Sequence, residues 1–303
     1  MQTNENPKGN IMERIILGDN QFFGINHMSE ELARQQSIRF QTDAAIISVL
    51  DAAYDEGIKA FMCTTHSRLA AICRHVRNNP QHYSSFVFYP CMPYAHKYAD
   101  AVTQYGMIGA LKYFTPRGNV LNSAILGGIA VARSDIETLI KMLIDAEMKM
   151  FAGVSTPVIF LQNILTDLLL GLHYHEAFRV FQDHVKTKYD AEAGFITMNL
   201  PRLLDALNTA GISNPIICSN INKIGFRMSG GKEKYEELIE KSTFRPVAMS
   251  IFASGSINPH EAVEYLAGLG DIEGIVFGAS NRKNIQDTVR LLSQRYRAPR
   301  PIS

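Results

Sequence analysis

The chain has 303 residues, of which 46% are hydrophobic and 19% are charged, and its formal net charge is +1. This composition predicts a globular protein with a large core, and the apolar runs are too short or too interrupted to cross a bilayer. Lysine and arginine are spread along the sequence without forming a basic stripe, which argues against nucleic acid as a partner.

Residues 1–12 are polar and lack the cationic and apolar regions of a secretion signal. The four cysteines lie in apolar strand-like or helical runs, as is expected of reduced thiols. We therefore expect a cytoplasmic protein that begins with a polar arm over residues 1–12.

Short apolar runs rich in β-branched and aromatic residues alternate with helical patterns along the chain. These runs predict strands at residues 14–18, 58–63, 86–91, 157–161, 194–198, 215–219, 246–251 and 273–278. A helix start is marked at Asn258, which is followed by Pro259 and by an acid in the first turn. Eight strand–helix units predict a (β/α)8 TIM barrel, whose functional residues gather at the carboxyl ends of the strands.

Residues 95–156 separate the third and fourth predicted strands by more than an ordinary crossover. They carry roughly three helical patterns, which predicts a helical insertion within a single TIM-barrel domain spanning residues 1–303. The insertion could cap the site or form a contact between subunits, so the sequence leaves a homo-oligomer open.

Gly/Ser turns come directly before the last two predicted helices, in SIFASGSINPHEAVEYL and IVFGASNRKNIQDTV. Small residues at a helix N-terminus let backbone N–H groups approach an anion, and the turns after strands seven and eight are a common phosphate site in barrels. Arg282 and Lys283 could add positive charge. We therefore expect a small-molecule ligand that carries phosphate, the alternative being that these glycines serve only tight turns.

The stretch AFMCTTHSR places Cys63 and His66 at the end of the second predicted strand. The pair could be half of a metal site, a nucleophile beside its base, or part of a neutral rim. A metal site needs further ligands, and His27 and His96 lie in different loops. We predict no metal site and interpret the stretch as a neutral rim.

Four segments resemble the aldo-keto reductase superfamily, in the order in which that family carries them. LGDNQFFG is similar to its opening LGTxxFG, and DAAYDEGIKAF is similar to the helix before its second strand. GFITMNLPRLLDALNTAGISNPIICSNINKIGF resembles its GVSNF stretch, and IVFGASNRKNIQDTV resembles its closing cofactor segment. The resemblance covers nearly the whole chain outside the insertion and implies a barrel that binds a nicotinamide cofactor.

The resemblance also implies a catalytic tetrad of Asp, Tyr, Lys and His, none of which is present. The corresponding positions hold Met62, Ser67, Pro90 or Cys91, and Gln162. Ordinary carbonyl reduction is therefore not expected, because neither Met62 nor Ser67 can supply the proton.

Three other residues are candidates for catalysis. His66 or Tyr94 could act as the acid, with Lys97 or Lys223 nearby to lower its pKa. Lys223 could instead form a Schiff base, as in aldolases, although the mixed polarity of NINKIGF around it does not suit the dry pocket that such a lysine needs.

The cofactor contacts that the resemblance implies are kept unevenly. Ile196 and Thr197 replace its Ser-Asn pair, Ser219 its Gln, Met249 its stacking Tyr and Thr288 its adenine-contacting Asn, whereas Gly278, Ala279 and Ser280 are kept. The predicted cofactor-binding residues are Asp19, Asn20, Thr197, Ser219, Ser250, Gly255, Gly278, Ser280, Arg282 and Lys283.

We therefore predict a divergent aldo-keto reductase-like protein that binds a phosphate-bearing ligand, with NADP(H) as the candidate cofactor. Its oxidoreductase chemistry is expected to be either non-standard or lost. Two alternatives stay open: a Schiff-base or metal-dependent lyase, and a binding protein without catalysis.

Overall fold

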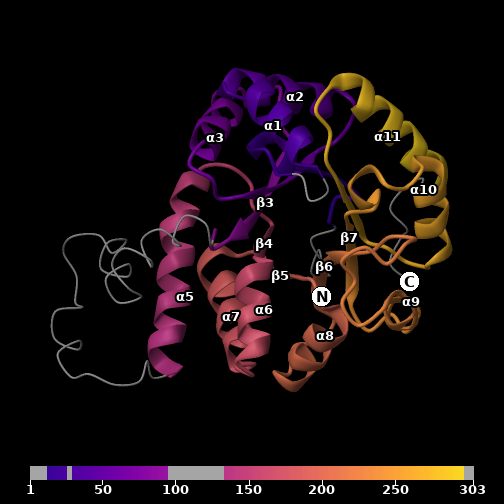
Figure 1. Cartoon of the computed structure of the whole chain (residues 1–303). Helices are drawn as coiled ribbons and strands as arrows, with labels where there is room; N and C mark the ends of the chain where they lie inside the picture. The colour runs from indigo at the N-terminus through magenta and orange to yellow at the C-terminus, as the bar shows by residue number, and fades with distance from the viewer. Residues whose placement is uncertain (1–11, 26–28, 95–132, 297–303) are drawn as a thin grey trace, which may run out of the picture.

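The computed structural model describes residues 12–25, 29–94 and 133–296, and Figure 1 shows its strands surrounded by helices. The strands are β1 (Ile15–Gly18), β2 (Ala60–Thr64), β3 (Val87–Met92), β4 (Val158–Leu161), β5 (Glu192–Thr197), β6 (Ile216–Asn220), β7 (Arg245–Met249) and β8 (Gly274–Phe277). All are parallel and close in chain order, so that β8 pairs with β1. The predicted TIM barrel is confirmed, and every strand end lies within two residues of its predicted position.

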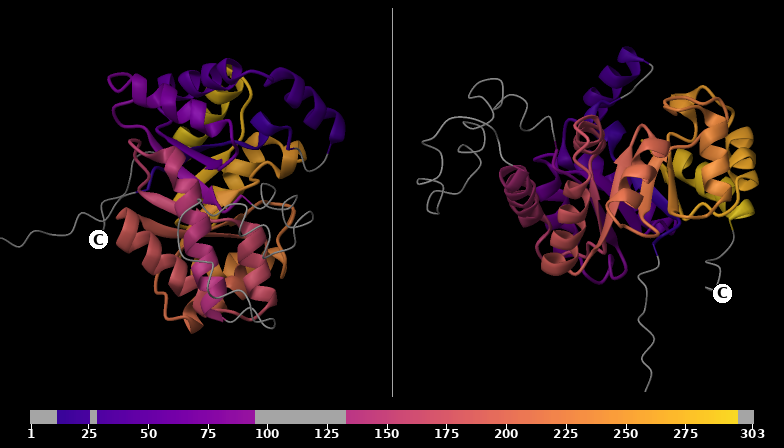
Figure 2. Two further views of the ribbon diagram at one scale, coloured as in Figure 1. Left: turned by 90° about the vertical axis from the view of Figure 1, so that its left-hand side faces the viewer. Right: turned by 90° about the horizontal axis from the view of Figure 1, so that it is seen from below.

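The helices are α1 (Glu30–Arg39), α2 (Asp43–Asp55), α3 (Leu69–Asn78), α5 (Arg133–Met148), α6 (Asn163–Gly171), α7 (Glu176–Tyr189), α8 (Leu200–Thr209), α9 (Lys232–Glu240), α10 (Pro259–Gly268) and α11 (Arg282–Arg295). Three short 3-10 helices are η1 (Asn20–Phe23), η2 (Lys149–Phe151) and η3 (Ala253–Gly255). Helix α1 has no buried residue, and Figure 2 shows it projecting from the barrel. Within the described ranges, no helix combines the length and apolar character that a membrane span requires.

Residues 1–11 and 95–132 lie outside the described residues, so the polar arm and most of the helical insertion remain predictions. The described part of the insertion contains α5 and η2. Helix α5 contacts α7 through Asp145. The Asp145 carboxylate accepts hydrogen bonds from His184 at 2.8 Å, Lys188 at 2.6 Å and Tyr189 at 2.5 Å. In its described part, this segment therefore covers the outside of the barrel.

The barrel wall separates two apolar clusters. The inner one fills the barrel and includes Ile16, Tyr89, Phe160, Ile216 and Val276. The outer one lies between strands and helices. Successive side chains of a strand point to opposite faces, so Met62 belongs to the inner cluster whereas its neighbours Phe61 and Cys63 belong to the outer one. This alternation decides which residues can reach a ligand inside the barrel.

A charged cluster lies at the amino ends of the strands. The guanidinium of Arg245, the first residue of β7, donates to Glu192 of β5 at 2.5 Å and binds Glu273, next to β8, through two nitrogens. Tyr89 accepts a hydrogen bond from the backbone N–H of Glu13 at 2.9 Å on the same side. Because these charged and polar groups are paired with one another at the amino ends of the strands, a ligand is expected at the carboxyl ends.

Candidate active site

A cavity of about 1120 Å³ opens at the carboxyl ends of the strands. Its floor is apolar and consists of the inward-facing side chains Met62, Cys91, Ile196, Met249 and Val276. Polar residues surround the floor, among them Asp19, Asn20, Tyr94, Gln162 and Asn220. The cavity has the position of a TIM-barrel active site, with an apolar centre and a hydrogen-bonding rim.

One carboxylic acid in the lining of the cavity is Asp19, which follows β1 and is 6% exposed. Thr64, at the end of the neighbouring β2, donates its backbone N–H and its hydroxyl to Oδ2 of Asp19, each at 2.7 Å. Burial raises the pKa of the Asp19 carboxyl to about 6, although both Thr64 bonds favour the charged form. A carboxyl with this pKa can exchange a proton near neutral pH.

The loop that carries Asp19 is tied to the last strand. Gln21 donates from Nε2 to the carbonyl oxygens of Gly18 at 2.8 Å and Ala279 at 3.0 Å. A Cβ on Gly278 would approach Gln21 Oε1 to 2.5 Å, so a side chain here would displace the Gln21 amide from these two hydrogen bonds. The sequence analysis gave Gln21 no such role, because its partners are distant in the chain.

Tyr94 follows β3 and lines the same cavity. Its backbone N–H faces both carboxylate oxygens of the fully buried Glu147, at 3.2 and 3.1 Å, and the hydroxyl of Thr65 also donates to Glu147. Burial and the charge of Asp19 raise the pKa of the Tyr94 hydroxyl, so it stays protonated. Tyr94 is thus a hydrogen-bond donor fixed at the rim.

His66, the other predicted acid, does not line the cavity. Its ring stacks on Phe23, with centroids 4.2 Å apart and planes inclined by 19°, and its Nδ1 accepts from the backbone N–H of Arg68 at 3.3 Å. Burial and the charge of Arg68 lower the pKa of this imidazole, so it is neutral at physiological pH. Cys63 belongs to the outer core, where burial raises the pKa of its thiol. The two residues therefore do not form a catalytic pair.

Two predicted cofactor contacts point away from the cavity. The hydroxyl of Thr197 donates to Asp167 of α6 at 2.6 Å, and Ser219 is fully buried beside it in the adjacent strand. Neither residue lines the cavity, because the alternation of strand side chains sends Ile196 inward and Thr197 outward.

Lys223 and Lys283 also lie outside the lining of the cavity. The ammonium of Lys223 is solvent-exposed and contacts Glu261 at 2.6 Å. This position does not supply the dry pocket that a Schiff-base lysine needs, because Lys223 forms a surface ion pair.

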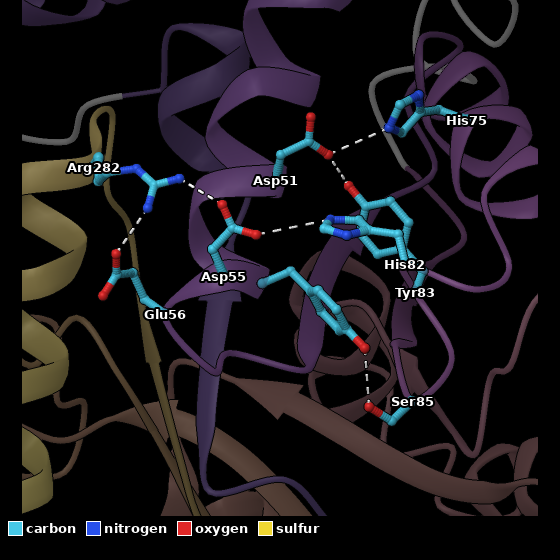
Figure 3. A network of polar contacts seen from close by, with 9 residues as sticks. Asp51, Asp55, Glu56, His75, His82, Tyr83, Ser85 and Arg282 are labelled. Carbon is cyan, nitrogen blue, oxygen red and sulfur yellow. Dashed lines mark hydrogen bonds and ion pairs between the residues drawn. The ribbon is translucent and has the colours of Figure 1, made fainter.

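Arg282 contacts α2 rather than a ligand. Figure 3 shows its guanidinium between Asp55, at 2.6 Å, and Glu56, at 2.9 Å. Asp55 also lies 3.9 Å from His82. The predicted phosphate contact of Arg282 is not seen in this structure, where its charge holds the first turn of α11 against α2.

The turns after β7 and β8 do line the cavity, as predicted, through Ser250, Gly255, Gly278 and Ser280. The first of these turns holds Ser250, Ala253 and Ser254 in left-handed backbone conformations, with φ of 54°, 45° and 56°. Such conformations are costly for residues with a side chain and are concentrated at functional sites.

The cavity continues from the β8 turn along one side of α11. Asn281 caps this helix by accepting from the N–H of Asn284 at 2.8 Å. The lining then includes Thr288, Leu291 and Gln294. An extended ligand would fit such a groove, with one end on the barrel floor and the other on α11. Asn281 already accepts the N–H of Asn284, so only the earlier N–H groups of the first turn could receive an anion.

Arg227, in the loop after β6, is a cavity residue that the sequence analysis missed. It stands in NKIGFRM, which has no turn or phosphate signature, so no signal in the sequence would have identified it. Among the described residues, no cluster of three His, Cys, Asp or Glu side chains could hold a metal ion. His27 and His96 lie outside those residues.

No protein-family model and no curated protein matches the sequence. Solved structures with a similar fold include a proposed aldo-keto reductase from Pseudomonas aeruginosa, which is 12% identical and has a TM-score of 0.57 over 93% of this chain and 90% of that one. A proposed 2,5-diketo-D-gluconic acid reductase B is 8% identical, with a TM-score of 0.54 over 92% and 81% of the two chains.

The fold is therefore that of an aldo-keto reductase-like barrel, as the sequence resemblance implied. Identities of 8% and 12% establish a shared fold and nothing about individual residues. The roles of the site residues must be argued from the geometry of this chain.

Proposed function

We propose that this protein is an NADP(H)-binding oxidoreductase that reduces a carbonyl group with Asp19 as the proton donor. The observation that supports this proposal is the buried Asp19 carboxyl at the mouth of the barrel, with a pKa of about 6, in a cavity that continues as a groove along α11. It differs from the family pattern because the acid comes from the end of β1, whereas Met62 occupies the expected position on β2.

Asp19 has the properties of a general acid. With a pKa of about 6, about one tenth of the molecules carry the proton at pH 7. Thr64 occupies Oδ2 with two donors, which leaves Oδ1 to carry the proton. Proton transfer from a positioned side chain typically accelerates a reaction by about 10²- to 10⁴-fold.

Tyr94 acts beside Asp19 as a neutral donor. Tyr94 lines the cavity, and burial together with the charge of Asp19 raises the pKa of its hydroxyl, which is therefore protonated. A hydrogen bond from Tyr94 to the carbonyl oxygen would orient the substrate and stabilise the charge that develops on that oxygen. The bonds from Tyr94 and Thr65 to Glu147 fix the two rim loops relative to each other.

The residues along the β7 and β8 turns and α11 fit a phosphate-bearing dinucleotide. Gly255 and Ser280 line the groove, which continues beside the N-terminus of α11, and the floor offers Met249 and Val276 to a flat ring. Bound NADPH would supply the hydride. In such a reduction Asp19 would give its proton to the carbonyl oxygen, and the Asp19 carboxylate would then recover a proton from solvent.

Two measurements test this function. The melting temperature of the protein should rise saturably with NADPH, because a ligand that binds the native state stabilises it. Loss of NADPH absorbance with a panel of aldehydes and ketones should then reveal turnover. Asp19→Asn should keep the NADPH-induced shift and reduce turnover by about 100-fold or more. Turnover that is unchanged in Asp19→Asn would contradict the proposed role of this residue.

The orientation of Thr197 and Ser219 favours a second candidate, in which the barrel binds a phosphate-bearing ligand without hydride transfer. Neither hydroxyl reaches the cavity, so the contacts that would hold a nicotinamide carboxamide are missing at these positions. In that case NADPH should give no thermal shift, while a sugar phosphate from a panel of phosphorylated metabolites should give a saturable one.

A further inference from the structure

The loop after β6 is held by two buried amides. Asn222, fully buried, accepts from the Phe226 N–H at 2.8 Å and donates to the Phe226 carbonyl at 2.9 Å. Asn220, 1% exposed, donates to the carbonyl oxygen of Arg227 at 2.9 Å. Both buried amides thus form hydrogen bonds with the backbone of this one loop. These bonds fix the backbone at Phe226 and Arg227.

Arg227 itself has a strained backbone. Its φ is +55°, in the left-handed region that is unfavourable for a residue with a side chain. The guanidinium lies 5.6 Å from the centre of the Phe226 ring, and the residue lines the cavity. The two amides therefore maintain a conformation that is unfavourable for arginine at an exposed position in the lining of the cavity.

The charge of Arg227 has no counterion in the described part of the chain. The ion pairs of the described residues do not include it, whereas the other arginine of the cavity, Arg290, contacts Asp287 at 3.2 Å. Lys223, four residues earlier in the same loop, pairs with Glu261 at 2.6 Å. A guanidinium that lacks an ion-pair partner is suited to a carboxylate or phosphate, which it can bind through two parallel hydrogen bonds.

Arg227 and Asp19 belong to different sides of the barrel mouth. Arg227 follows β6 and Asp19 follows β1, and β7 and β8 separate these strands in the closed order. The groove that would receive the dinucleotide follows the β7 and β8 turns. A substrate on the barrel floor therefore has an acid on one side and an unpaired cation on another.

We infer that the substrate is a carbonyl compound with a negatively charged group, and that Arg227 binds this group while the carbonyl lies toward Asp19. This inference rests on the proposed function for the identity of the reacting group. The binding of the charged group by Arg227 can be tested without cofactor or turnover.

Two matched pairs of probes distinguish the sources of the charge. Succinic semialdehyde and its neutral amide test a carboxylate, and glyceraldehyde phosphate and glyceraldehyde test a phosphate. Dissociation constants are measured by calorimetry on the full chain without cofactor. At least one charged probe should bind about tenfold or more tightly than its neutral partner. Arg227→Gln should reduce this preference to about twofold or less, and Arg227→Lys should restore part of it.

Lys223→Gln is the matched control, because it removes the same charge from the same loop outside the cavity. It should leave the preference for the charged probe unchanged. Equal losses in both variants, or a preference that survives in Arg227→Gln, would overturn the inference. If neither charged probe is preferred by the unmodified protein, the inference also fails. The proposed oxidoreductase function fails separately, by the absence of NADPH binding or turnover.

Discussion

Thr64 gives both of its hydrogen-bond donors to a single oxygen of Asp19, at 2.7 Å each. One donor is the backbone N–H at the end of β2, which Thr64→Val leaves in place, whereas the other is a hydroxyl that this substitution removes. The relationship joins the first two strands at the mouth of the barrel and sets the charge state of the proposed acid. It therefore allows the role of Asp19 to be tested without replacing Asp19 itself.

Thr64→Val should raise the pKa of Asp19. The Thr64 hydroxyl stabilises the carboxylate, so its loss favours the protonated form. Carbonyl reduction needs that form, and its rate should fall above a pH of about 6 in the unmodified protein. In Thr64→Val this fall should move up by roughly one pH unit. The pH profile of kcat/KM checks this, and Thr64→Ser, which keeps the hydroxyl, should retain the original profile.

Asp19→Asn should stabilise the protein at pH 7 to 8. The pKa of this carboxyl is raised from 3.8 to about 6 on folding, so the folded state binds the proton more tightly than the unfolded state. The protonated Asp19 carboxyl stabilises the folded state relative to the ionised one. This stabilisation is fully present below a pH of about 4 and is lost as the pH rises through about 6. The resulting cost at neutral pH is at most about 3 kcal/mol.

The measurement is urea unfolding of both proteins at several pH values. The advantage of Asp19→Asn should be greatest above pH 7 and should shrink toward pH 4, where the native carboxyl is also neutral. A stability difference that does not depend on pH would mean that Asp19 does not titrate as proposed.

The barrel could be predicted from the sequence because each strand is a short apolar run and each turn has a distinct composition. Residues of the turns, such as Gly278 and Ser280, were placed in the site for the same reason. Side-chain direction was harder to predict, because a shift of one residue exchanges the two faces of a strand. Thr197 and Ile196 illustrate this: the apolar residue lines the cavity and the polar one contacts α6.

Partners that are distant in the chain could not be predicted either. Arg282 follows a phosphate-type turn, and its contacts with α2 depend on the closure of the barrel, which brings α11 beside α2. Asp19 was expected only to contact a cofactor. Its burial and its two bonds to Thr64 depend on how β1 and β2 pair, so its raised pKa could not be predicted from the sequence. Both cases show charged groups whose role is decided by tertiary neighbours.

Arg282→Gln should leave the affinity for NADPH within about threefold of the original, because its guanidinium contacts Asp55 and Glu56 instead of the groove. The side chain is half exposed, so the melting temperature should fall only slightly, and less so at high salt. Fluorescence titration with NADPH checks the first expectation. A large loss of affinity without a change in melting temperature would restore Arg282 as a ligand contact.

Gly194→Ala should destabilise the barrel by about 1 to 3 kcal/mol. Gly194 of β5 pairs with Phe160 of β4, and a Cβ at this position would lie 2.4 Å from the Phe160 ring, which is fully buried inside the barrel. Neither residue can move aside, because the strands on both sides are fixed by their hydrogen bonds. Urea unfolding of the variant measures the loss.

Phe160→Leu provides the second variant of a double-mutant cycle. Alone it should destabilise the protein, because it removes part of a ring from the packed interior. In the presence of Gly194→Ala, the smaller side chain leaves room for the new methyl group, so the double variant should be more stable than the sum of the two losses implies. Additive losses would show that the methyl group is accommodated by a shift of the backbone of β5, and that the close approach of Gly194 to Phe160 does not set the packing of the barrel interior.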